Sequence, residues 1–223
     1  MTEQTFSRRL AAEFIGTAML LAVIVGSGIM AERLAGGNMA IALLGNTIAI
    51  GVALVALILM FAPVSGAHLN PIVSIAAALT RDMAWADAGV YVSIQIAGAL
   101  FGVALANLMF DLPIFFAAEK VRTGSAQWLG EFIASFGLIG VIIAVSRRHK
   151  TFVVALAVAA YITAAIWFTS STSFANPAVT VARSLSNTYT GIRPPDAPLF
   201  IIAQLFGGVA AAIVFNWLIP RDS

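Results

Sequence analysis

Residues 65–74 of the chain read Ser-Gly-Ala-His-Leu-Asn-Pro-Ile-Val-Ser, and residues 173–180 read Ser-Phe-Ala-Asn-Pro-Ala-Val-Thr. Asn is favoured immediately before a helix, and Pro is favoured in the first helical turn, where its missing N–H costs nothing. Each stretch therefore predicts a helix that begins after Asn70 or Asn176. Both stretches lie between long apolar segments, so a polar helix start occurs twice in hydrophobic surroundings.

The composition is typical of a membrane protein that crosses the bilayer several times. Of the 223 residues, 61% are hydrophobic and 10% are charged, proportions that do not suit a soluble domain. The net charge is only +2, and no basic tract favours nucleic-acid binding. Cys is absent, and His68 and His149 have no cluster of metal ligands near them in the sequence. We therefore expect neither a metal site nor a cofactor.

Six segments have the length of a membrane span or nearly so, at about 9–30, 40–61, 88–109, 128–146, 152–170 and 198–219. The first segment follows two Arg residues as a signal peptide would, but its length and the lack of a clear cleavage site favour a first helix. If both termini are cytoplasmic, seven basic residues lie inside (Arg8, Arg9, Arg81, Arg147, Arg148, Lys150, Arg221) and five outside (Arg33, Lys120, Arg122, Arg183, Arg193). Three of the seven crowd into one turn at 147–150, which favours this orientation in the inner membrane.

The two halves of the chain resemble each other. Ala-Glu-Phe-Ile-Gly-Thr at 12–17 matches Gly-Glu-Phe-Ile-Ala-Ser at 130–135, and Gln-Ile-Ala-Gly at 95–98 matches Gln-Leu-Phe-Gly at 204–207. Three spans in each half require the second half to enter the membrane from the opposite side. We therefore predict one domain, residues 1–223, built from an inverted repeat of about 8–110 and about 125–220, with a solute path between the halves. Chance similarity between alanine-rich helices is the alternative.

The helices after the Asn-Pro pairs, at about 71–80 and 177–186, are too short to span a bilayer. Ten residues at 1.5 Å each reach roughly 15 Å, about half of a hydrocarbon core near 30 Å. Two such half-helices from opposite faces would meet near the middle, and the irregular backbone before each would have to line a wet cavity. The alternative is that each Asn-Pro pair caps a helix in an ordinary surface loop.

The complete set of landmarks resembles the aquaporin, or major intrinsic protein, family, which carries two Asn-Pro-Ala boxes on inserted half-helices. The resemblance covers essentially the whole chain and implies an all-α fold of six transmembrane helices plus two re-entrant half-helices. It also implies that Asn70 and Asn176 donate amide hydrogen bonds to passing solute at the pore centre. The boxes would comprise Asn70, Pro71, Ile72, Asn176, Pro177 and Ala178, and the accepting backbone carbonyls would be those of Gly66, Ala67, His68, Thr172, Ser173 and Phe174. Glu13 and Glu131 would brace the loops, although an intramembrane carboxylate could instead relay protons.

The sequence departs from the family pattern at two positions. Ile72 stands where the first box has Ala, and we expect it to narrow the central constriction or to shift the opposing helix. Val179 stands where the second box usually continues into the Arg of the selectivity filter. Counting without gaps from the two Asn residues places the filter at Ile50, Ala164, Ser173 and Val179. Such a wide, uncharged ring predicts passage of neutral solutes larger than water: glycerol-like polyols, urea, and metalloid hydroxides such as arsenous acid.

Arg183 lies one helical turn beyond Val179 on the same face. It either stands in the outer vestibule and supplies the missing positive charge, or it contacts lipid headgroups or a loop. The expected function is a passive membrane channel that is permeable to water as well. The alternatives are a secondary transporter, which also uses inverted repeats, and a mainly water-selective channel. No nucleophile and base, metal cluster or phosphate loop indicates an enzyme. The expected partners are the lipid bilayer, small neutral solutes and, by family resemblance, three further copies in a homotetramer.

Overall fold

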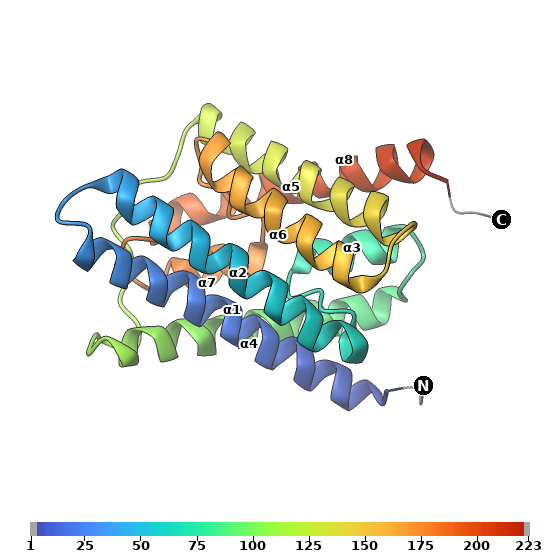
Figure 1. The fold of residues 1–223 in the computed structure, drawn as a ribbon, viewed down its shortest axis with the longest axis horizontal. Helices are drawn as coiled ribbons and strands as arrows, with labels where there is room; N and C mark the ends of the chain where they lie inside the picture. Colours follow the sequence, from blue (N-terminus) through green and yellow to red (C-terminus); the bar gives the residue numbers. More distant parts are fainter. Residues whose placement is uncertain (1–3, 221–223) are drawn as a thin grey trace.

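The computed structural model describes residues 4–220, which form a bundle of long helices around two short ones (Figure 1). The elements in chain order are α1 (Phe6–Leu34), α2 (Met39–Ser65), α3 (Pro71–Leu79), α4 (Trp85–Met109), α5 (Ser125–Ser146), α6 (Thr151–Phe168), α7 (Pro177–Arg183), the 3₁₀ turn η1 (Pro194–Asp196) and α8 (Ala197–Leu218). Within residues 4–220, six helices are long and apolar enough to cross a membrane. The expected six-span, all-α architecture is confirmed; Arg221 lies outside the described residues.

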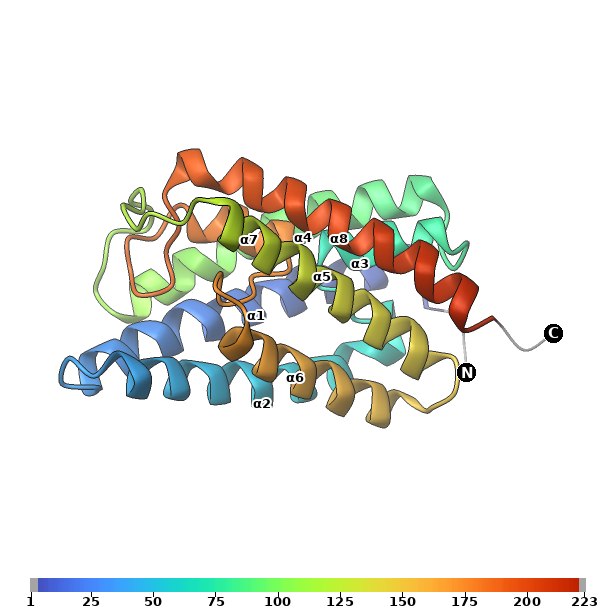
Figure 2. The ribbon, with the colours of Figure 1, turned by 90° about the horizontal axis from the view of Figure 1, so that it is seen from above.

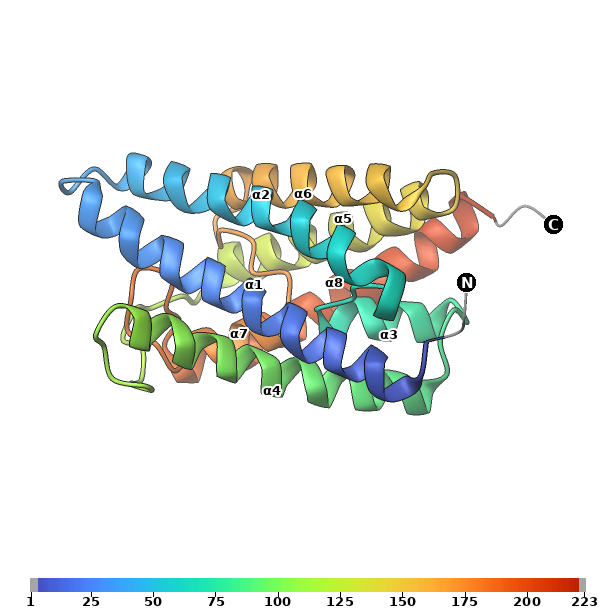
Figure 3. The ribbon, with the colours of Figure 1, turned by 60° about the horizontal axis from the view of Figure 1, so that its bottom comes forward.

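The bundle has two ends, which we name after the half-helices. α1 begins and α8 ends at the same end, and the turn at 147–150 between α5 and α6 lies there too (Figures 1 and 2). α3 lies in the half of the bundle nearest this end, whereas α7 lies toward the opposite end (Figure 3). We call these the α3 end and the α7 end. Each half-helix begins near the middle of the bundle and runs outward to its own end.

The long helices pack in the same way in both halves. α1 packs along α4 and also against α2, while α5 packs along α8 and against α6. The closest approaches fall at glycines: a Cβ at Gly98 of α4 would collide with the backbone oxygen of Phe14, and one at Gly207 of α8 would collide with that of Phe132. Small residues allow helix backbones to approach this closely in membranes. The two glycines follow Gln95 and Gln204 at the same spacing, so the matched sequence segments occupy matched positions.

The half-helices are shorter than expected. α3 has nine residues and α7 has seven, against the ten predicted for each. α7 ends at Arg183 because the chain then turns, with N–H groups of Ser184 and Leu185 bonded to the carbonyls of Val181 and Ala182. Ser186 instead forms a bridge to Phe116 in the loop between α4 and α5. This bridge holds that loop against the end of α7.

Candidate channel site

The two half-helices begin at capped Asn residues, as the sequence predicts. Oδ1 of Asn70 accepts a hydrogen bond from the N–H of Ile72 at 3.0 Å. Oδ1 of Asn176 accepts from the N–H groups of Ala178 at 3.0 Å and Val179 at 3.3 Å. Pro71 and Pro177 occupy the first helical positions. Because the side-chain oxygens point at the helix ends, the amide nitrogens point away from them.

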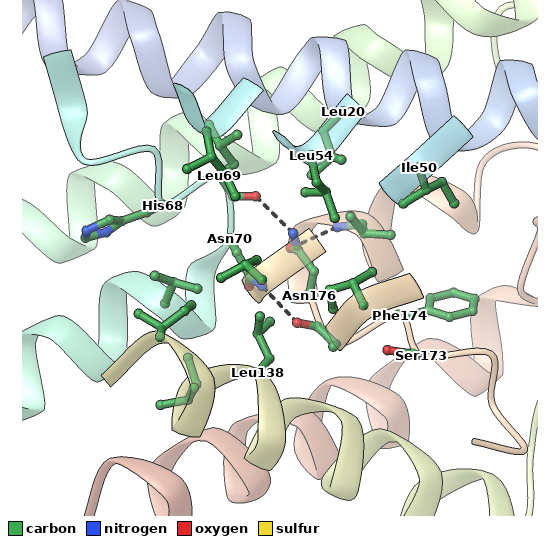
Figure 4. Close-up of a pocket in the computed structure, with 18 of the residues that line it drawn as sticks. Leu20, Ile50, Leu54, His68, Leu69, Asn70, Leu138, Ser173, Phe174 and Asn176 are labelled. Carbon is green, nitrogen blue, oxygen red and sulfur yellow. Dashed lines mark hydrogen bonds between the residues drawn. The ribbon is translucent and has the colours of Figure 1, made fainter. Parts of the chain in front are cut away.

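Those amide nitrogens join the two halves. Nδ2 of Asn70 donates to the carbonyl oxygen of Ala175 at 2.8 Å, and Nδ2 of Asn176 donates to that of Leu69 at 2.9 Å. Figure 4 shows both bonds crossing between the loops at the centre of the cavity. An amide nitrogen carries two hydrogens, so each of these bonds leaves one N–H for another acceptor. Both Asn residues line the cavity.

The backbone immediately before each Asn adopts a left-handed conformation at several non-glycine residues. The φ angles are 51° at Ala67 and 50° at Leu69 in the first loop, and 47° at Ser173 and 45° at Ala175 in the second. Such residues cost about 1–2 kcal/mol each and persist only where their surroundings hold them. Because of these left-handed residues, successive peptide groups face different sides of each loop. Some of them bond to the protein, and others face the cavity.

In the first half, the buried Glu13 carboxylate holds the loop. Its Oε1 accepts from the Ser65 hydroxyl at 2.6 Å and from the N–H of His68 at 3.0 Å. Its Oε2 accepts from the N–H of Leu69 at 2.7 Å and from Nε2 of Gln95 at 2.8 Å. All of these partners are donors, so both oxygens of this completely buried carboxylate have hydrogen-bond partners.

Glu131 makes the corresponding contacts in the second half. Its Oε1 accepts from the N–H of Phe174 at 2.8 Å, and its Oε2 accepts from the N–H of Ala175 at 2.9 Å and from Nε2 of Gln204 at 2.6 Å. Both carboxylates thus bind the last two peptide N–H groups before their Asn, together with a Gln from the packed helix. This geometry is the one that the bracing role predicts for both residues.

A cavity of about 870 Å³ runs through the bundle between the halves. Arg147 and Arg148 line it at the α3 end, and Lys120 and Tyr189 line it at the α7 end. All six residues whose carbonyls were expected to face the pore line this cavity: Gly66, Ala67, His68, Thr172, Ser173 and Phe174. The cavity therefore passes both Asn residues on its way from one end of the bundle to the other.

Three of the four expected filter residues line the cavity, and the fourth does not. Ile50, Ser173 and Val179 are among the lining residues. Ala164 is exposed on the outer face of α6, and its assignment was wrong. The residues of α6 that face the cavity are Val154, Val158, Ile162 and Ile166, spaced four apart. Ala164 lies midway between the last two in sequence and hence on the opposite side of the helix.

Ile72 does not reach the central constriction, so the expectation that it narrows this constriction was wrong. It does not line the cavity, and its side chain is completely buried on the other side of α3. There it packs with Ile139, Ala211 and Ala212. A Cβ at Gly208 of α8 would collide with Ile72, so the glycine supplies the room for the larger side chain. α8 therefore makes room for the Ile72 side chain, and this side chain does not narrow the cavity.

Arg183 lines the cavity at the α7 end and contacts a loop at the same time. Its Nε donates to the carbonyl oxygen of Thr190 at 2.5 Å, and its guanidinium carbon lies 3.3 Å from the centroid of the Phe174 ring. Of the two alternatives, lipid contact does not fit a side chain that is only 6% exposed. The positive charge stands one helical turn beyond Val179, as the vestibule hypothesis requires.

The sequence analysis missed a second guanidinium at this end. Arg122, in the loop between α4 and α5, lines the cavity and is only 7% exposed. Its Nε donates to the carbonyl of Gly191, and its Nη1 donates to Ser171 O and Thr172 Oγ1. No periodic pattern places a residue of an irregular loop. The position follows from the bridge to Ser186 and from the bond between the Arg122 N–H and Asp196.

Comparison with known proteins agrees with this geometry. The sequence model of the family described as "Major intrinsic protein" matches residues 1–173 and again residues 119–222. The chain belongs to the major intrinsic protein family. It is a member of a family of membrane channels for small solutes, which is not a family of enzymes. Within residues 4–220, no group of three His, Cys, Asp or Glu side chains is arranged to hold a metal ion.

The alignments with individual relatives cover nearly the whole of this chain. The aquaglyceroporin AqpS of Rhizobium meliloti (strain 1021) is 52% identical over 219 residues, which cover 98% of this chain and 93% of that one. Aquaporin NIP3-1 of Oryza sativa subsp. japonica is 29% identical and covers 98% of this chain and 70% of its own. The X-ray structure of the aquaglyceroporin from Plasmodium falciparum superposes with a TM-score of 0.71 at 21% identity, over 97% of this chain and 98% of that one, and shows the fold.

Proposed function

We propose that this channel conducts neutral solutes larger than water, namely glycerol-like polyols, urea and metalloid hydroxides such as arsenous acid, together with water. The observation that carries the proposal is the layer around Val179. Val179, Ile50 and Ser173 line the cavity there, and α6 contributes isoleucines. At this layer an apolar side chain replaces a guanidinium, which removes a fixed charge, several hydrogen-bond donors and bulk from one wall.

Exclusion of ions follows from the wall and from the half-helices. The middle of the cavity is lined by apolar side chains such as Leu20, Leu54 and Leu138. An ion that lost its hydration there would find few polar partners, and the transfer of an unpaired charge to such surroundings is very costly. Both half-helix N-termini also point at the centre and repel cations and protons. A neutral polyol needs only the two Asn amides and the loop carbonyls.

The named relatives support this solute class. The relative that is 52% identical over nearly the full length is called an aquaglyceroporin, and so is the solved structure with the same fold. The word aquaglyceroporin indicates passage of both water and glycerol. Such passage agrees with a cavity that is wider at the Val179 layer than the filter of a water-selective channel. The metalloid part of the proposal rests on chemistry alone, because arsenous acid is neutral at pH 7 and resembles glycerol in shape.

The test is solute flux into vesicles that contain the purified channel. Water, glycerol, urea and arsenous acid are compared by stopped-flow light scattering or uptake. We expect Val179→Arg to reduce glycerol and arsenous acid flux at least about tenfold, an effect of about 1.4 kcal/mol on the barrier, while water flux changes little. Val179→Leu is the matched control, since it adds volume without charge. Unchanged glycerol flux in Val179→Arg would show that this layer is not the filter.

The same vesicles separate the competing functions. A channel gives glycerol flux that rises linearly with concentration and needs no ion gradient. Saturation together with a gradient requirement would identify a secondary transporter, which also builds its site between inverted repeats. Water flux without glycerol flux would identify a water-selective channel. Each outcome leaves the family assignment in place and decides only how the path is used.

We further propose that the α3 end faces the cytoplasm of a bacterial cell and that the channel is a homotetramer in the inner membrane. The orientation is supported by Arg147, Arg148 and Lys150 in the turn between α5 and α6. This turn lies at the end of the bundle where α1 begins and α8 ends. The tetramer is supported by the resemblance of the sequence to its family. A C-terminal reporter active only outside the cytoplasm tests the first proposal, and the mass of the detergent-purified protein tests the second.

A further inference from the structure

Three cationic side chains gather at the α7 end of the cavity. Lys120, Arg122 and Arg183 all line it there. The two guanidinium carbons lie on one ring: that of Arg183 is 3.3 Å and that of Arg122 is 5.1 Å from the centroid of Phe174. The Lys120 ammonium lies 4.7 Å from the centroid of Tyr189, which also lines the cavity. We call Lys120, Arg122 and Arg183 the cationic cluster.

The hydrogen bonds of this cluster end on neutral oxygens. Besides the bonds of Arg122 and Arg183 described above, Lys120 donates to the carbonyl oxygen of Tyr189 at 2.8 Å. In the part of the chain that the structure describes, the salt bridges join Arg9 to Asp87 and Arg193 to Asp196, and no member of the cluster takes part in one. Two guanidinium groups are therefore nearly buried beside each other without a carboxylate partner, an arrangement that costs free energy unless an anion is bound.

The acidic groups nearest the cluster serve other purposes. The Glu131 carboxylate accepts three hydrogen bonds from the second loop and Gln204. The Asp196 carboxylate accepts from the Arg122 backbone N–H and from the Arg193 side chain. Glu32 is exposed on α1 and affects Lys120 only through space. None of these carboxylates forms a salt bridge with the guanidinium groups, and the Glu131 carboxylate acts on both of them only through space.

We propose that the cationic cluster binds a small oxyanion at the α7 end of the cavity, and that the bound anion obstructs solute passage. A guanidinium has five N–H donors. Arg183 uses its Nε, and Arg122 uses its Nε and Nη1, so the outer nitrogens that face the cavity remain for a ligand. Guanidinium groups bind oxyanions with paired, charge-assisted hydrogen bonds, and the Lys ammonium adds a third positive charge.

The anion is bound but not conducted. Immediately inward of the cluster, Val179 and Ile50 line the cavity and offer no charge or donor. An oxyanion that moved past Val179 would leave three positively charged side chains and enter apolar surroundings. This transfer has a high desolvation cost. Neutral solutes do not pay this cost. The inference goes beyond the proposed solute selectivity and does not depend on which neutral solute the channel prefers.

The affinity of the cationic cluster for the anion is expected to fall as the pH rises. Lys120 lies outside the membrane-spanning helices, and burial beside Arg122 and Arg183 lowers its pKa to about 8, against the raising effect of Glu32. Burial also lowers the pKa of Arg122, to about 10, and raises the pKa of Tyr189. Lys120 therefore loses its positive charge between pH 7 and pH 9. Because the protonated form attracts the anion, affinity falls as the pH rises through about 8.

Isothermal titration with sulfate, whose charge is constant over this range, tests the proposal on the purified full-length channel at fixed ionic strength. We expect the wild type to bind sulfate at pH 7, and Arg183→Gln to bind it at least about tenfold more weakly. Arg33→Gln removes one exposed positive charge at the same end, outside the cavity, and should bind like the wild type. A wild type that does not bind sulfate, or equal binding by the two variants, overturns the site.

Two further measurements keep the proposal testable if Arg122 or Arg183 variants fail to fold. Lys120 is exposed as a whole residue and only its ammonium is covered, against Tyr189, so Lys120→Gln should fold. It should bind sulfate several-fold more weakly at pH 7 and lose the fall in affinity between pH 7 and pH 9. In vesicles with sulfate on both sides, glycerol flux through the wild type should slow, and flux through Lys120→Gln should slow less. Sulfate flux as fast as glycerol flux would overturn the claim that the anion is held without being conducted.

Discussion

Ile72 and Gly208 fit together across two helices: the side chain of Ile72 occupies the space into which any Cβ at Gly208 would project. Ile72 stands at the start of α3, where the family usually has Ala, and Gly208 stands on α8. The side chain is completely buried with Ile139 and Ala211 and has no contact with the cavity. The larger residue in the first box is thus matched by a residue with no side chain in the second half.

This fit predicts a stability effect without a selectivity effect. Ile72→Ala removes three carbons from a packed site and should lower the free energy of unfolding by about 2–5 kcal/mol. Gly208→Ala should also destabilise, because the new methyl group would collide with Ile72. The double variant should be more stable than the two separate losses would give. Thermal unfolding in detergent measures all three, and the ratio of glycerol to water flux should remain that of the wild type.

Ile48→Ala is the matched control for this cycle, because Ile48 is 53% exposed on α2. It should change the unfolding temperature little. If Ile72→Ala altered the flux ratio while leaving stability intact, the side chain would have to lie in the path, contrary to its burial. Strict additivity in the double variant would likewise show that the two residues do not share a space.

The parts of the site that could be predicted from sequence are those with local causes. Asn70 and Asn176 cap their helices through contacts within three residues, so Asn-Pro alone predicted where α3 and α7 begin. Glu13 and Glu131 were predicted because they recur at matched places in the two halves. Each then proved to bind two peptide N–H groups of its own loop. Helix capping and internal repetition are properties of the chain itself.

The parts that failed depend on neighbours distant in sequence. Counting from Asn176 to Ala164 ignored the loop after Phe168, and a shift of two residues is enough to turn a helical side chain to the opposite face. The effect of Ile72 could not be known without Gly208 beside it. Arg122 belongs to an irregular loop, which the bridge between Phe116 and Ser186 brings to the cavity. No periodicity in the sequence expresses such a contact.

The correction at α6 makes a sharp prediction. Ile166→Trp places a large ring where the lining of the cavity lies, and it should reduce glycerol flux at least about tenfold. Ala164→Trp places the same ring on the exposed outer face of the same helix and should leave flux near the wild-type value. Stopped-flow measurements on equal amounts of reconstituted protein compare the two. Blockage by Trp at 164, with free passage in the variant at 166, would restore the original assignment.

The two carboxylates predict a reciprocal pattern of backbone protection. Replacing Glu131 with Gln turns one acceptor oxygen into a donor that faces the N–H of Phe174 or Ala175, whereas the first loop keeps Glu13. Hydrogen bonds to charged groups contribute about 1.5–3 kcal/mol, so exchange of these two amides should speed about tenfold or more. Hydrogen exchange in Glu13→Gln should show the same change at His68 and Leu69 instead. Each variant is the control for the other. Equal acceleration in both loops from either substitution would mean that the loops open as one unit through the bonds of Asn70 and Asn176, and that the carboxylates do not brace them separately.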